Sequence, residues 1–342
     1  DTKLQFQPNH NYNANVAGNY VLYDFGRLKA NIERNKVELQ FAKDNVDYVK
    51  AQLANQVAVI YYNVVYFQKA ISIQDTVLNY LNENKKIVQS KLNNGDALKI
   101  DLLNIQASID NEQNRKIDLQ NSLQKQLNLL SYTTGKTIAN GTQFDFDINT
   151  NSIEALLNNA VANNIDFKLA KNRIKLAETD IAISKLQDKP TIAATAGLGF
   201  RNGYVPEIQK FQFNGLAGVS INVPLYTGGK TKQQIKLQQT IVKQNELAVE
   251  TLNSTFKKDI EQALTDINTN KERIYNTQGQ IEQALAAQQL ASTRFKNEVG
   301  TNLEITNAST NVQRAFFTKL QYEYQLCLAK VELARLLGFE YW

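Results

Sequence analysis

The segment NVPLYTGGKTKQQIKLQQT, residues 222–240, decides the fold because it joins a strand-like pattern to a helix-like pattern. Apolar and polar residues alternate before Leu225-Tyr226-Thr227-Gly228-Gly229, and a long polar helix pattern follows. The segment YVLYDFGRLKANIERNKVELQ, residues 20–40, makes the same change at Leu22-Tyr23-Asp24-Phe25-Gly26. The two junctions lie 203 residues apart (225 − 22), which predicts two copies of one structural unit.

Each junction contains residues suited to a sharp turn. Proline has no amide hydrogen for a sheet ladder, so it suits the end of a strand. Glycine adopts backbone angles that other residues avoid, so it lets the chain turn without a side-chain clash. We therefore assign the strand-to-helix junction to Gly26, Pro224, Gly228 and Gly229.

Further pairs of positions extend the repeat. Gly135 and Gly338 end the stretches LLSYTTG and ELARLLG, again 203 residues apart (338 − 135). Gly95 and Gly300 are expected to be equivalent helix-ending turns, at an offset of 205 (300 − 95). Apolar residues that recur every seven positions predict left-handed packing between helices. These residues are Val57, Val64, Ile71 and Leu78 in one copy and Ile260, Ile267, Ile274 and Ile281 in the other.

The spacing of glycine and proline predicts long helices. Residues 28–92 contain neither, which corresponds to a helix of roughly 100 Å at 1.5 Å per residue. We expect a first repeat over residues 1–135, a mixed segment over 136–188 and a second repeat over 189–338. The repeats should contain a strand at 11–23, a helical hairpin at 27–132, a β-hairpin at 190–226 and a helical hairpin at 229–337. Symmetry predicts that a further helix and strand precede residue 1.

The expected strands have one apolar face and one polar, uncharged face. Residues from Phe211 to Val223 show this alternation. Strands of about ten residues suit a transmembrane barrel with lipid outside and water inside. A soluble antiparallel sheet with one buried face gives the same pattern, so the pattern favours neither.

Composition excludes several functional classes. With one His and one Cys in 342 residues, a disulfide framework, a cysteine zinc site and a histidine metal cluster are excluded. The net charge of +5 is spread along helices, which does not favour nucleic-acid binding. The apolar run at residues 57–67 is too short for a transmembrane helix. We predict no enzymatic activity, no metal site and no cofactor.

One chain cannot close these elements into a globule. Four strands, counting the one that symmetry predicts, are too few for a barrel and leave sheet edges exposed. Strand edges cannot face lipid, so strands in a membrane require several chains to associate. Association would close the sheet and place the helices around a channel.

The segment VPLYTGGKTKQQIKLQQ, residues 223–239, resembles the strand-to-helix junction of the TolC-like outer membrane efflux proteins. The two hairpin tips of that family resemble KLNNGDALKIDLLNIQASID and FKNEVGTNLEITNASTNVQRAFF in this chain. The repeat endings of the family resemble LLSYTTG and ELARLLG. The resemblance implies a mainly α fold with β strands. Long antiparallel coiled-coil hairpins would form an α-barrel tunnel, and the strands would contribute to a trimeric transmembrane β-barrel.

The function that the resemblance implies is the outer-membrane exit duct of a tripartite efflux or type I secretion system. Such a duct is a passive channel-tunnel for export of small molecules or proteins. It lies in the outer membrane of a Gram-negative-type envelope and extends into the periplasm. The resemblance implies that the chain forms a homotrimer. The implied partners are a periplasmic adaptor (membrane fusion) protein, an inner-membrane pump of the RND, ABC or MFS type, and outer-membrane lipid.

The resemblance also implies two groups of site residues. The adaptor should contact the hairpin tips at Asn94, Gly95, Asp96, Val299, Gly300 and Thr301, although the glycines could simply end their helices. A periplasmic constriction is expected at Asp101, Asn302, Thr306 and Ser309. Asp101 matches a family carboxylate, but it could instead be a first-turn acid that the helix dipole favours. Some members of the family have aspartates where this chain has Thr306 and Ser309. Some members have a basic residue where this chain has Asn302.

A second class of function also fits long hairpins joined to strands. The chain could be a periplasmic adaptor or another coiled-coil interaction protein with a soluble β domain. Adaptors normally have one hairpin flanked by lipoyl-like β segments, whereas this chain predicts two hairpins in tandem. A requirement for detergent separates the two, since only the duct should need it.

Overall fold

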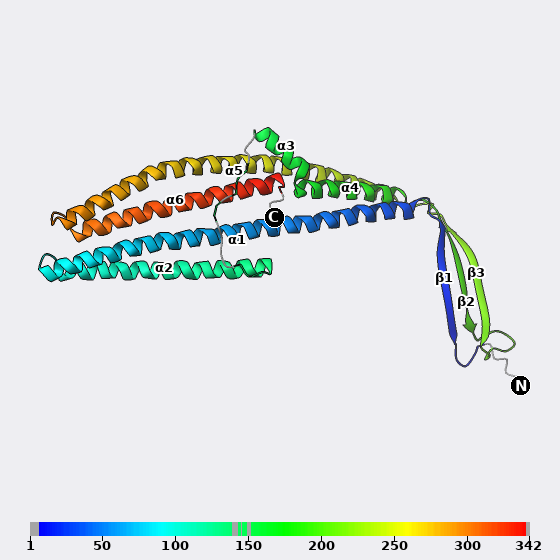
Figure 1. Ribbon diagram of the computed structural model, residues 1–342. Helices are drawn as coiled ribbons and strands as arrows, with labels where there is room; N and C mark the ends of the chain where they lie inside the picture. Colours follow the sequence, from blue (N-terminus) through cyan, green and yellow to red (C-terminus); the bar gives the residue numbers. More distant parts are fainter. Residues whose placement is uncertain (1–6, 139–142, 145, 149–151, 340–342) are drawn as a thin grey trace. The chain divides into compact units, whose positions relative to one another are not determined.

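The computed structural model describes residues 7–138, 143–144, 146–148 and 152–339 (Figure 1). Residues 139–142, 145 and 149–151 of the expected segment 136–188 lie outside the described residues. The elements are β1 (Asn13–Tyr23), α1 (Arg27–Asn94), α2 (Lys99–Thr134), α3 (Ile153–Asn163), α4 (Ile165–Lys185), β2 (Thr191–Arg201), β3 (Gln212–Asn222), α5 (Lys230–Lys296) and α6 (Asn302–Leu337). This mainly helical architecture with a small antiparallel sheet confirms the predicted fold class.

The chain divides into two compact units, each built from two segments of sequence. One combines Asp1–Asn45 with Lys168–Glu250, and the other combines Val46–Phe167 with Thr251–Trp342. The first unit therefore contains the strands, and the second contains the turns of both helical hairpins. No helix in the described part of the chain has an apolar stretch long enough to cross a membrane.

The three strands form one antiparallel sheet in the order β1-β2-β3 (Figure 1). Tyr20 of β1 lies opposite Ala194 of β2, which in turn lies opposite Val219 of β3. Residues directly opposite one another share a face of an antiparallel sheet, so Val16, Leu198 and Phe213 lie on one side with the other residues of their apolar series. Val21 and Leu216 lie on the opposite side. The asparagines of β1 also lie on that opposite side, where Thr195 Oγ1 donates a hydrogen bond to Asn19 Oδ1 over 3.3 Å.

Nothing in the described residues covers the apolar face of this sheet. Val16 is 82% exposed, Tyr20 72% and Val219 69%. In addition, β1 and β3 each pair along only one edge within the described residues. A face of this kind requires another apolar surface or lipid, and each free edge offers unpaired backbone groups to a further strand.

The repeat extends to backbone angles at the two strand-to-helix turns. Gly26 has φ +92° and Gly229, 203 residues later, has φ +78°. The preceding residues, Phe25 and Gly228, have φ +55° and +61°. The same left-handed pair therefore turns the chain twice, although the first copy uses phenylalanine where the second uses glycine. Pro224 lies just beyond the last residue of β3, as a strand end requires.

Both long helices begin against the connection between α4 and β2. The Arg27 guanidinium donates hydrogen bonds to the carbonyl oxygens of Leu186 and Lys189, over 3.0 and 3.2 Å. Thr231 Oγ1 donates to Asp188 Oδ1 over 2.6 Å. These bonds satisfy backbone groups at the end of α4 and fix where α1 and α5 start relative to β2.

The core of the second unit follows the heptad positions. Ile260 and Ile267 are fully buried, and they pack with residues of α3 and α6 around Phe167 and Phe256. The rings of these two phenylalanines meet edge to face with centroids 4.9 Å apart. The seven-residue pattern of α5 is thus an apolar seam, as the sequence predicts.

Asp166, in the first turn of α4, is partly buried beside this core. Burial raises the pKa of its carboxyl group above the ordinary 3.8, and the charge of Arg335 partly opposes the shift. Because the pKa is raised in the folded state, the protonated carboxyl group makes its full contribution to the free energy of unfolding below pH 3.8. That contribution is lost as the pH rises through the folded-state pKa. Asp166→Asn should therefore raise the thermal midpoint at pH 7 by roughly 1–3 °C. A thermal unfolding scan at pH 3.5 should show a smaller increase in the midpoint. The control is Asp96→Asn, a substitution at an exposed aspartate.

Candidate functional site

The first hairpin turn has the hydrogen bonds of a left-handed helix cap. Gly95 has φ +87°, its N–H donates to the Leu92 carbonyl over 3.2 Å, and Asp96 N–H donates to the Lys91 carbonyl over 2.8 Å. This pattern ends α1 by satisfying two of its last carbonyl groups. The three predicted contact residues Asn94, Gly95 and Asp96 are all exposed.

The second turn has the same cap, but Glu298 occupies the left-handed position. Glu298 has φ +64°, and Val299 N–H donates to the Arg294 carbonyl over 3.0 Å. The residue equivalent to Gly95 is thus Glu298, at the common offset of 203 (298 − 95), and the expected equivalence of Gly300 is wrong. Gly300 is needed for a different reason: a Cβ there would lie 2.8 Å from Arg294 Cβ and 3.0 Å from Phe295 N.

Because Glu298 and Gly95 are equivalent, we expect glycine to be the more stable residue at both positions. Glu298→Gly removes the strain of a side chain at positive φ, so it should be more stable than Glu298→Ala by about 1 kcal/mol. Gly95→Ala introduces that strain and should lower stability by a similar amount. Thermal unfolding of the three variants in detergent measures both. Equal midpoints for Glu298→Gly and Glu298→Ala would show that the turn bears no such strain.

After each turn, a side-chain oxygen caps the start of the return helix. The Asp101 carboxylate accepts a hydrogen bond from Leu98 N–H over 3.1 Å. In the second copy, Thr301 Oγ1 accepts from Glu304 N–H over 3.3 Å. Acidic residues in the first turn also interact favourably with the helix dipole. The side chain of Asp101 therefore has a local capping role, whatever it does in addition.

The predicted constriction residues lie together at the starts of α2 and α6. Asn302 is only 4% exposed, and its Nδ2 donates to the Asp101 carbonyl over 3.1 Å, which joins the starts of α2 and α6. Thr306 Oγ1 donates to the Asn302 carbonyl over 3.1 Å. Ser309 is buried, and it lines a cavity of about 390 Å³ with Thr306. Three of the four residues thus form one hydrogen-bonded chain.

The sequence patterns did not predict the ion pairs at the tips. Lys91 Nζ lies 3.5 Å from Glu298 Oε1 and faces the Phe295 ring, 5.5 Å from its centroid. Arg294 pairs with Glu304 over 3.2 Å and donates to the Val299 carbonyl. The first pair connects the two hairpins, which no local sequence signal reveals. Because Glu298 and Arg294 are well exposed, these pairs contribute little stability.

Both tips also expose large apolar side chains. Ile100 is 54% exposed on α2, and Leu303 is 66% exposed at the equivalent position on α6 (303 − 100 = 203). Further exposed apolar residues on the tips are Leu98 (68%), Leu103 (55%) and Val299 (66%). Just behind them lies a buried cluster that includes Val88, Ile105, Phe295 and Ile305. A firm apolar support beneath exposed apolar side chains is typical of a protein-binding surface.

The described residues contain no group of three or more His, Cys, Asp or Glu side chains that could hold a metal ion. The tips offer shape, apolar area and a few charges. Such a surface can dock a partner, and its buried side chains can hold the two hairpins together.

A continuous sheet-to-helix chain with paired helical hairpins is the fold of bacterial outer membrane channels. The outer membrane protein VceC from Vibrio cholerae matches with a TM-score of 0.77 and 18% identity, over 95% of this chain and 79% of that chain. The CusC channel matches with a TM-score of 0.78 and 18% identity, over 96% of this chain and 78% of that chain. The open state of the Neisseria gonorrhoeae MtrE outer membrane channel matches with a TM-score of 0.77 and 18% identity, over 97% of this chain and 81% of that chain. No curated protein sequence matches the chain significantly.

A profile of the family described as outer membrane efflux protein matches residues 3–136 and 156–339. The two matched ranges correspond to the two repeats and cover most of the chain. The chain belongs to the outer membrane efflux protein family. It is accordingly a member of a channel family and not an enzyme.

Proposed function

We propose that this protein is the outer-membrane exit duct of a tripartite efflux or type I secretion system. It would act as a passive trimeric channel-tunnel for small molecules or proteins. The observation that carries the proposal is the uncovered apolar sheet face with two free edges in the described residues. Lipid would cover the face, and strands of sibling subunits would pair with the edges.

The proposed location follows from the same features. The sheet would lie in the outer membrane of a Gram-negative-type envelope, and the helices would extend into the periplasm. In β1, residues 13–20 mostly alternate apolar or small residues with asparagines, so a closed barrel would have an apolar outside and a mainly polar lumen. Arg201, opposite Asn13, would add a charge at one end of that lumen.

We propose that a periplasmic adaptor protein docks on the hairpin tips and links the duct to an inner-membrane pump. The turn residues Asn94, Gly95, Asp96, Val299, Gly300 and Thr301 would contact the adaptor, and Asn94, Asp96 and Thr301 would supply the polar side chains. The exposed Ile100 and Leu303 would form its apolar part, one on each hairpin. The duplicated arrangement would give each subunit two similar docking positions for one kind of helical partner.

The constriction is proposed to lie beside this surface. The Asn302–Asp101 hydrogen bond holds the starts of α2 and α6 together, and Thr306 and Ser309 continue along the same helix. These contacts would set the width of the periplasmic entrance. Because the side chains at 306 and 309 are hydroxyls, we do not expect them to bind cations strongly.

Conductance in a planar lipid bilayer tests the proposed function. Detergent-purified protein should insert and produce discrete, long-lived conductance steps. Protein that remains soluble and monomeric without detergent, and produces no steps, would contradict the proposal and favour a soluble coiled-coil protein.

A further inference from the structure

Three polar residues, of which Gln74 and Gln313 are buried and Glu112 is half-buried, stand in mainly apolar heptad series of the second unit. Gln74 of α1 occupies the series Ile60, Phe67, Gln74, Leu81 and Val88, and it is fully buried. Glu112 of α2 stands seven residues from Ile105 and from Leu119. Gln313 of α6 is 6% exposed and begins the series Gln313, Leu320, Cys327 and Ala334. Gln74 and Glu112 thus have apolar residues at both neighbouring heptad positions, whereas Gln313 follows Thr306 and precedes Leu320.

These three side chains form one hydrogen-bonded layer. Gln74 Nε2 donates to Glu112 Oε2 over 2.6 Å and to the Glu112 carbonyl over 2.9 Å. Gln313 Nε2 donates to the same Oε2 over 2.6 Å and to Gln74 Oε1 over 3.1 Å. Arg115 Nη1 donates to Glu112 Oε1 over 2.8 Å. The carboxylate therefore has donors from α1, α2 and α6.

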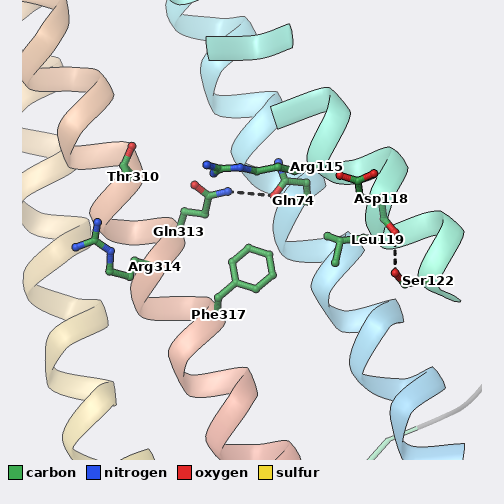
Figure 2. A pocket seen from close by; sticks show the side chains of 9 residues that line it. All are labelled: Gln74, Arg115, Asp118, Leu119, Ser122, Thr310, Gln313, Arg314 and Phe317. Carbon is green, nitrogen blue, oxygen red and sulfur yellow. Dashed lines mark hydrogen bonds between the residues drawn. The ribbon is translucent and has the colours of Figure 1, made fainter. Parts of the chain in front are cut away.

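Figure 2 shows Gln313 on α6 pointing toward Gln74 on α1, with Arg115 of α2 beside them. A cavity of about 510 Å³ lies on one side of the layer and includes Leu119 and Phe317 in its lining. The cavity of about 390 Å³ near Thr306 and Ser309 is also lined by Glu112 and Gln313. The polar layer thus connects the hairpins at a level where the packing around it is open.

Apolar layers join the hairpins at two other levels. Toward the tips, Val88 of α1 packs with Ile105, Phe295 and Ile305. Farther along α1, Tyr62 and Val65 pack with Cys327 and Val331 of α6. Apolar contacts that repeat every seven residues tolerate a slip of one heptad, about 10 Å along the helix, because the seam would meet similar residues again.

The polar layer does not tolerate that slip. After a slide of seven residues, Gln313 would lie beside Phe67 or Leu81 instead of Gln74, and the Glu112 carboxylate would lose the amide that α6 provides. A buried polar group left without its partner destabilises the packing strongly, whereas apolar contacts change little. The layer therefore distinguishes one register from its neighbours.

We propose that Gln74, Glu112 and Gln313 set the axial register of the α5–α6 hairpin on the α1–α2 hairpin. This register brings Lys91 to Glu298 and Asp101 to Asn302, so it also aligns the two tip turns. The use of that alignment for adaptor docking rests on the proposed function. The register itself does not, and it can be measured separately.

Cross-linking tests the register directly in the full-length, detergent-purified protein with Cys327→Ala. Lys69 and Glu323 form an ion pair at 3.8 Å between α1 and α6, so Lys69→Cys with Glu323→Cys reports the native register. Lys69→Cys with Phe316→Cys, or with Lys330→Cys, reports a slip of one heptad in either direction. A short bis-maleimide reagent and peptide mass spectrometry identify links within one subunit, because links between subunits give a dimer on a denaturing gel.

The test variant combines Gln74→Leu, Glu112→Leu and Gln313→Leu, which keeps the seam buried but removes the layer. Without these three substitutions, only the native pair should link. In the variant, the ratio of slipped to native links should rise by about tenfold or more, since several bonds to a charged group are lost. The exchange Gln74→Glu with Glu112→Gln keeps an amide–carboxylate contact and should retain native links.

Two outcomes would overturn the proposal. One is a folded triple variant, judged by circular dichroism, that still links only in the native register. If the triple variant does not fold, Gln313→Leu alone is tested. The second outcome is that this single variant folds and still links only in the native register. Conductance in a bilayer plays no part in this measurement, so a failed channel assay and a failed register assay remain distinct.

Discussion

Val219→Arg should abolish assembly of the protein in the outer membrane, whereas Ser220→Arg, one residue along the same strand, should be tolerated. Val219 lies on the apolar face of β3, opposite Ala194, and is 69% exposed. If lipid covers this face, arginine near the middle of the bilayer costs about 2–4 kcal/mol per subunit. In a trimer the cost applies three times. Ser220 lies on the polar face, where a charged side chain would reach water in the lumen.

Fractionation of cells and quantitative immunoblotting of the outer membrane measure this effect. We expect at least a tenfold loss of outer-membrane protein for Val219→Arg and less than about a twofold change for Ser220→Arg. Val219→Leu keeps the apolar face and controls for substitution at that position. Equal losses for the two arginine variants would contradict the assignment of lipid and lumen to the two faces.

The double variant Ile100→Asp with Leu303→Asp should abolish efflux without removing the protein from the membrane. The two residues occupy equivalent positions on the two tips and are exposed in the chain, so the charged variants should fold. If the adaptor buries both side chains, each contributes about 1.5–3 kcal/mol to docking. Loss of both should weaken adaptor binding by at least roughly a hundredfold.

The matched control is Ile100→Leu with Leu303→Ile, which keeps the apolar area at each tip. Accumulation of a fluorescent efflux substrate in cells and co-purification of the adaptor measure the two consequences. The aspartate variant should lose both, and the control should keep both. If the aspartate variant retains adaptor binding, the tips are not the docking surface, even if the protein is a duct.

The fold was predictable because its main features are periodic. Strand alternation and heptad spacing are local properties of the sequence, and the long gaps between glycines predicted the helices directly. The repeat added independent support, since each feature had to occur twice at one offset. It also predicted the order of sheet, long helix and return helix.

Backbone conformation at the turns was less predictable. Glycine suggests a left-handed residue, but Phe25 and Glu298 adopt positive φ without being glycine. The cap hydrogen bonds on either side of these residues determine their conformation, and a sequence does not display such bonds. Gly300 led to the wrong equivalence because its requirement comes from the close approach of Arg294 and Phe295 rather than from φ.

The contacts between hairpins were not predictable from local patterns. Gln74 and Gln313 are far apart in sequence, and each alone resembles an ordinary polar residue on a helix. Only the packing of α1, α2 and α6 shows that they share the Glu112 carboxylate. The same holds for Lys91 with Glu298, because the partner is chosen by register and not by spacing within one helix.

Electron cryo-microscopy of the detergent-extracted protein shows directly whether several chains close the sheet into one barrel. We expect a threefold particle in which β1 and β3 of each subunit have partners along their outer edges, so that the sheet is continuous around a pore. A single-subunit particle with an open sheet, stable in water without detergent, would rule out the proposed duct.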